Sequence, residues 1–126
     1  MITIARVYDY RGQTGAISVL VDRVWPRGVT KEKAGVDLWI KEIAPSDDLR
    51  KWFNHEDSKW TEFRRKYFAE LDGRMEIVRA LRGVSKGGNM VLLYSARNTV
   101  HNNAVALKEY LETHLDTAPV DPGALN

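Results

Sequence analysis

Short apolar runs alternate with longer amphipathic stretches along the 126-residue chain. The nearly continuous apolar runs at 16–22 and 90–94 are typical of strands that are covered on both faces. The β-branched segment 2–8 predicts a third strand. Residues 36–43 fit a helical stripe and a strand equally well, because so short a segment does not define its own period.

Helical spacing dominates the middle and the end of the chain. Ser46, followed by two aspartates, predicts the N-cap of a helix that carries Leu49, Trp52 and Phe53. A second helix is expected at 57–71, and a third at 75–81 that ends in a turn at 83–88. The last helix carries an apolar stripe of Val100, Ala104, Leu107, Leu111 and Leu115.

Strands separated by helices predict a single α/β domain over residues 1–115. Its sheet should be small and mostly parallel, with about four strands flanked by helices. The length suits one domain, and 44% hydrophobic and 29% charged residues are ordinary globular values. Residues 116–126 contain two prolines and few apolar anchors, so we expect a flexible tail.

The composition and the motifs exclude several kinds of catalytic and metal-binding site. The absence of cysteine excludes disulfides, thiol nucleophiles and cysteine-bound metal centres. No metal-binding, dinucleotide or phosphate-loop motif is present, so no metal site is expected and no cofactor can be named. The segment 55–57 (His-Glu-Asp) has metal-capable side chains, but helix capping by Asp57 explains it more simply.

Charge and hydropathy limit the partners. The net charge is +2 and the pI is about 8.9, and the densest basic run, 64–66, would fan around a helix axis. These values argue against nucleic acid as a partner, although weak nucleic-acid binding stays open as an alternative. Without a signal-peptide pattern or an apolar run of about 20 residues, we expect no membrane association and a cytoplasmic location.

Ligands of open parallel sheets bind beyond the carboxyl ends of the strands. Two polar segments follow predicted strands here, one at 22–28 and the other at 94–103. We expect Arg23, Arg27 and Arg97 to hold a small anionic ligand, because guanidinium groups suit carboxylates and phosphates. The further ligand-binding candidates are Trp25 as an apolar wall, Ser95 and Asn102.

The candidate catalytic residues of this site are His101 and Asp22, with His101 as a general acid or base. A structural explanation competes with this one. Asp22 could pair with Arg23 or Arg27 in a buried network, and Asn98 or Thr99 could cap the last helix. The chain could also be a non-catalytic partner-binding or regulatory module, and a homo-oligomer stays open.

Several segments resemble the YeaO-like family, small bacterial and archaeal proteins classed as a domain of unknown function. The resemblance rests on Asp-Arg-Val-Trp-Pro-Arg-Gly at 22–28 and on the segments 43–53 and 92–102. It covers nearly the whole chain except the tail. It implies a strand at 36–43. It also places the cysteines of wider relatives at Tyr94 and Asn102 and a histidine at Asn103, so their thiol or Cys/His metal chemistry cannot operate here.

Overall fold

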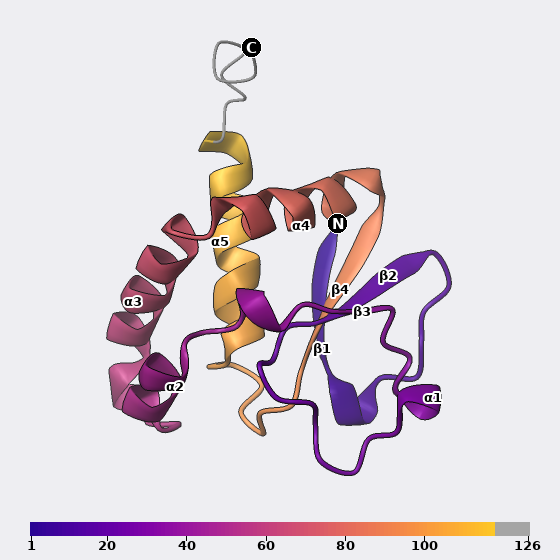
Figure 1. Cartoon of the computed structure of the whole chain (residues 1–126), viewed down its shortest axis with the longest axis horizontal. Coiled ribbons are helices and arrows are strands. Elements are labelled where there is room, and N and C mark those ends of the chain that lie inside the picture. Colours follow the sequence, from indigo (N-terminus) through magenta and orange to yellow (C-terminus); the bar gives the residue numbers. More distant parts are fainter. Residues whose placement is uncertain (118–126) are drawn as a thin grey trace.

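A four-stranded sheet lies at the centre of the computed structural model, which describes the backbone of residues 1–117 and the side chains of residues 1–113 (Figure 1). All its strands are parallel, in the order β1-β4-β2-β3. They are β1 (Ile2–Arg6), β2 (Ala16–Leu20), β3 (Leu38–Trp39) and β4 (Asn89–Tyr94). This sheet confirms the predicted α/β class.

Within residues 1–117, five α-helices accompany the sheet: α1 (Lys31–Ala34), α2 (Asp47–Phe53), α3 (Trp60–Asp72), α4 (Met75–Gly87) and α5 (Asn103–Thr117). The Ser46 hydroxyl accepts a hydrogen bond from the Leu49 amide at 3.1 Å, so the predicted N-cap of α2 is confirmed. None of the helices described is long and apolar enough to cross a membrane. Of the predicted tail 116–126, residues 118–126 lie outside the described part, as does the side chain of Leu115.

The two faces of the sheet are covered differently. Side chains of a strand alternate between its faces, so Met90, Leu92 and Tyr94 pack against the main helices while Val91 and Leu93 point the other way. The helices α3, α4 and α5 cover the first face, and loops with half-buried aromatic side chains cover the second (Figure 1). Coverage on both faces explains why β4 reads as an unbroken apolar run.

The strand boundaries differ from those predicted. β1 ends at Arg6, because the chain turns through Val7–Asp9 as a 3-10 helix. The segment 36–43 does hold a strand, but only Leu38–Trp39 pairs with β2, and a 3-10 turn at Lys41–Ile43 follows. β3 is an edge strand, so a single neighbour limits its length.

Helix boundaries also differ. α4 continues through Gly83 to Gly87, where a turn was expected. The helix penalty of one glycine, about 1 kcal/mol, is small beside the packing of Val78, Leu81 and Val84 on the core. α5 begins at Asn103 because the Asn102 side chain accepts the Val105 amide at 2.9 Å, which makes Asn102 the cap rather than Asn98 or Thr99.

Candidate functional site

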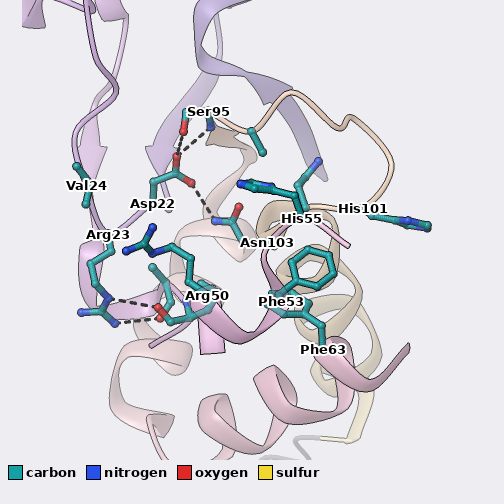
Figure 2. Close-up of a pocket in the computed structure, with 14 residues that line it drawn as sticks. Asp22, Arg23, Val24, Arg50, Phe53, His55, Phe63, Ser95, His101 and Asn103 are labelled. Carbon is teal, nitrogen blue, oxygen red and sulfur yellow. Dashed lines mark hydrogen bonds between the residues drawn. The ribbon is translucent and has the colours of Figure 1, made fainter. Parts of the chain in front are cut away.

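A cavity of about 200 Å³ opens beyond the carboxyl ends of β2 and β4 (Figure 2). Those two strands are paired neighbours, so the polar segments that follow them meet here. The end of α2 and the start of α5 complete the wall. The lining includes Asp22, Arg23, Val24, Pro45, Arg50, Phe53, His55, Phe63, Ser95, His101, Asn102 and Asn103.

Asp22 occupies one wall and is held by neutral donors. Its Oδ2 accepts the Ser95 amide at 2.9 Å and the Ser95 hydroxyl at 2.6 Å, and its Oδ1 accepts the Asn103 amide group at 3.0 Å. Burial raises the pKa of the Asp22 carboxyl, and the hydrogen bonds from Ser95 and Asn103 oppose that shift. Asn103 also donates to the Val21 carbonyl at 3.0 Å, which ties α5 to the end of β2.

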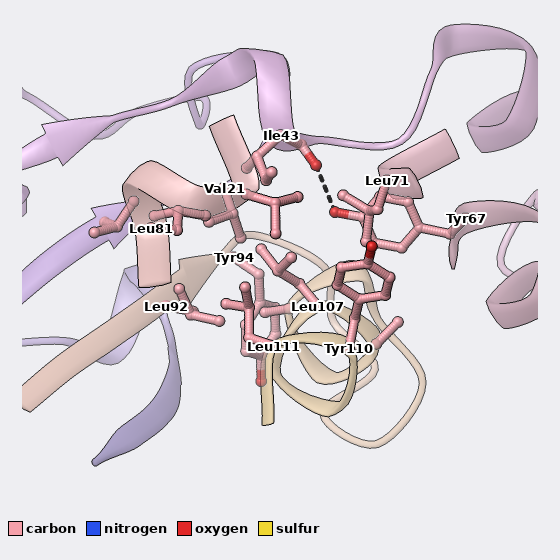
Figure 3. Packing of buried hydrophobic residues seen from close by; sticks show 14 of the residues in the cluster. Val21, Ile43, Tyr67, Leu71, Leu81, Leu92, Tyr94, Leu107, Tyr110 and Leu111 are labelled. Atoms are coloured by element: carbon pink, nitrogen blue, oxygen red, sulfur yellow. Dashed lines mark hydrogen bonds between the residues drawn. The ribbon is translucent and has the colours of Figure 1, made fainter. Parts of the chain in front are cut away.

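Arg23 is oriented by backbone rather than by a carboxylate. Its Nη2 donates to the Ala44 carbonyl at 3.2 Å and its Nε to the Pro45 carbonyl at 3.3 Å. These two bonds leave other N–H groups of the guanidinium for a ligand. The same segment is anchored to the core, because the buried Tyr67 hydroxyl donates to the Ile43 carbonyl at 2.5 Å (Figure 3).

Arg50 and His55 are among the lining residues that were not predicted. The Arg50 guanidinium points toward Asp22 and Arg23 (Figure 2). Its Nη2 contacts Asp47 at 3.3 Å in an exposed ion pair. The His55 ring also points toward the Asp22 side of the cavity (Figure 2). A left-handed backbone at Asn54 and His55, with φ of 49° and 56°, turns the chain there after α2.

His101 and Asn102 have structural partners. The His101 Nδ1 lies 2.9 Å from the Asp57 Oδ1, and its ring stacks on Trp60 at 4.7 Å between centroids. This ring points away from Asp22 (Figure 2). Asp57 therefore contacts the loop before α5 and is not the helix cap that was expected. Asn102 is almost fully buried, and its amide group donates to the Asn98 carbonyl at 2.9 Å.

The structure separates the three arginines that were expected to converge. Only Arg23 lines the cavity, whereas Arg97 lines a neighbouring, more open hollow of about 690 Å³ and exposed Arg27 is among the residues lining neither. Trp25 also lies elsewhere, because it packs edge-on against Trp39 on the loop-covered face and donates to the Val29 carbonyl at 2.7 Å.

The proposed ion-pair network of Asp22 with Arg23 or Arg27 is not formed: within residues 1–113, no ion pair involves any of these three side chains. The described side chains also contain no group of three or more histidine or acidic residues that could hold a metal ion. The cavity is therefore bounded by arginine and histidine side chains that face a single, internally hydrogen-bonded carboxylate.

Comparison with known proteins identifies the family. A family model described as the inactive DUF488-N3 subclade matches residues 1–124. The chain belongs to this subclade. It is 42% identical to the uncharacterized protein YeaO of Escherichia coli over 108 residues, which covers 86% of this chain and 94% of YeaO. It is 31% identical to the uncharacterized protein Rv3073c of Mycobacterium tuberculosis over 110 residues, which covers 87% of this chain and 92% of the relative. No solved structure matches.

The inactive DUF488-N3 subclade thus includes a chain whose site has no thiol. Tyr94, at a position where the sequence resemblance places a cysteine of wider relatives, is buried, and burial raises the pKa of its hydroxyl. Asn103, where a histidine was placed, is a hydrogen-bond partner of Asp22. Both positions have structural contacts in this member of the subclade.

Proposed function

We propose that this chain is a non-catalytic binding domain whose cavity holds a small molecule through an anionic group next to a short apolar part. The observation that carries the proposal is the shared lining of the cavity by Arg23, Arg50 and His55 on one side and by Phe53 and Phe63 on another. The site therefore combines cationic hydrogen-bond donors with an apolar wall, as small-molecule sites generally do.

The anionic group would lie between Arg23 and Arg50. A guanidinium is permanently charged and presents a planar fork that matches carboxylate and phosphate oxygens. Neither arginine pairs with Asp22, whose oxygens are occupied by Ser95 and Asn103. The Arg50–Asp47 ion pair is exposed and joins neighbours on one helix, so a ligand displaces it at little cost.

The apolar part would contact the two phenylalanines. Phe53 and Phe63 are buried, with ring centroids 4.4 Å apart, and Val24 and Pro45 line the same cavity. Burying one methylene group contributes about 0.8 kcal/mol to binding. The volume of about 200 Å³ lies below that of sites for drug-sized molecules, so the part of the ligand that occupies this cavity should be small.

Three considerations favour binding over catalysis. The family is described as inactive. His101, the candidate general acid or base, has a ring that stacks on Trp60 and points away from Asp22 (Figure 2). Asp22, the other candidate catalytic residue, is hydrogen-bonded on both oxygens to groups of the protein itself. A general acid or base must reach a substrate proton directly or through one water, and these two side chains do not face a common point in the cavity.

NMR titration tests the proposal. Hexanoate and phenyl phosphate are added to ¹⁵N-labelled protein, and we expect saturable shifts at the amides of Arg23, Arg50 and Ser95. Arg50→Ala should weaken binding by about tenfold, because a charge-assisted hydrogen bond is lost. Arg79→Ala is the matched control, since Arg79 is an exposed arginine of α4 away from the cavity lining. Shifts that do not saturate, or equal effects of both variants, would refute an anion site.

A further inference from the structure

The cavity and the hollow beside it share part of one wall. His55, Ser95 and Ala96 line both, so the two spaces meet at the loop that follows β4. The far side of the second hollow is lined by Arg6, Tyr8, Arg97 and Asn98. A ligand seated in the cavity can therefore extend past His55 and Ser95 into the second hollow.

A second pair of arginines lies at the far side of this hollow. Arg6 is the last residue of β1, and its Nε donates to the Ala96 carbonyl at 3.0 Å. Its guanidinium carbon lies 4.6 Å from the centroid of the Tyr8 ring, which orients the group further. Arg97 is exposed on the loop after β4. Neither side chain forms an ion pair within the part of the chain that the structure describes.

The register of the sheet sets the spacing of the strand ends that lie near the two arginine pairs. β4 lies between β1 and β2, with Arg6 opposite Tyr94 and Leu20 opposite Leu93. Neighbouring strands are about 4.8 Å apart, so the ends of β1 and β2 are about 10 Å apart across the sheet. Ser95, one residue beyond β4, lies between them.

We propose that the natural ligand is an elongated dianion with one anionic group at each arginine pair, a span on the order of 10 Å when the spacing of the strand ends is taken as the scale. One group binds Arg23 and Arg50, the other binds Arg6 and Arg97, and the connecting chain passes His55 and Ser95. This inference rests on the proposed function and adds the class of ligand. Two separated arginine pairs would select against small monoanions, which can engage only one pair.

Calorimetric titration with straight-chain dicarboxylates from succinate to sebacate tests this inference, with the monocarboxylates of equal length as controls. Affinity should peak at the dicarboxylate whose carboxyl carbons reach about 10 Å apart and exceed that of its monocarboxylate by about tenfold. Arg97→Ala changes an exposed side chain and should remove most of the higher affinity for the dicarboxylate. Arg6→Ala should remove the rest. Arg27→Ala should leave it unchanged, because Arg27 lines neither space.

The outcomes separate the two proposals. If dicarboxylates and monocarboxylates bind equally well and Arg97→Ala affects neither, the dianion inference is wrong while the single anion site stands. If no carboxylate of either series binds and phenyl phosphate gives no saturable NMR shifts, both proposals are wrong. Should Arg6→Ala fail to fold, the Arg97→Ala titration alone decides, because this substitution removes no hydrogen bond from the described structure.

Discussion

Ser95 donates both its backbone N–H and its hydroxyl to the same carboxylate oxygen of Asp22, at 2.9 and 2.6 Å. The two residues are 73 positions apart in sequence, and each follows one of two paired strands, β2 and β4. The contact therefore joins the two loops that begin at the carboxyl edge of the sheet. It also fixes one wall of the cavity, since both residues line it.

The stability of the protein should depend on the ionisation of Asp22. Burial raises the pKa of this carboxyl above its ordinary value of 3.8. A group whose pKa is higher in the folded state binds its proton more tightly there, so its contribution is fully present below the unfolded-state pKa and is lost as the pH rises through the folded-state pKa.

Asp22→Asn provides the comparison, because asparagine does not titrate. Urea unfolding of both proteins at several pH values from about 3.5 to 7 should show the wild type losing free energy of unfolding relative to the variant as the pH rises. A difference that stays constant over this range, or that moves in favour of the wild type, would contradict the raised pKa.

Arg23 and Arg27 should differ sharply although they lie in the same short segment. Arg23→Ala removes the donors to the Ala44 and Pro45 carbonyls and should lower the free energy of unfolding by about 1–3 kcal/mol. Arg27→Ala changes an exposed side chain and should stay within about 0.5 kcal/mol. Chemical denaturation measures both, and equal losses would show that our assignment of Arg23 is incorrect.

The fold could be predicted largely from the sequence because its strands are buried. The apolar runs of β2 and β4 and the capping serine of α2 are local signals, and all three appear in the structure. The two-residue β3 and the continuation of α4 through Gly83 could not be predicted this way. Both depend on contacts with other parts of the fold. β3 pairs only with β2, and the helix continues through Gly83 because its neighbours in α4 pack on the core.

The position of the candidate cavity could be predicted from the sequence, but only some of the residues that line it could. The strand-end rule placed Asp22, Arg23 and Ser95 together, and all three line one cavity, but their role as site residues stays a prediction. Arg50 carries no local signal of its role, because its place depends on how α2 packs beside the sheet. His55 was visible as a histidine in a turn, but only the left-handed backbone of the folded chain turns it toward the site.

Tyr67 should stabilise the segment that orients Arg23. Burial raises the pKa of its hydroxyl, so the group stays protonated and donates to the Ile43 carbonyl at 2.5 Å. Tyr67→Phe leaves that buried carbonyl without its donor and should cost about 1–2 kcal/mol in thermal or chemical unfolding. Tyr10→Phe is the control, because within the described structure the Tyr10 hydroxyl has no hydrogen bond, and a loss of the same size there would refute a specific role for Tyr67.

A crystal structure of the protein soaked with phenyl phosphate would show whether the cavity binds an anion between its arginines and beside its apolar wall. We expect the phosphate within about 3 Å of guanidinium nitrogens of both Arg23 and Arg50, and the phenyl ring against Phe53 and Phe63. A ligand bound elsewhere on the surface, or a cavity that stays without it at a concentration that saturates the NMR shifts, would contradict the account.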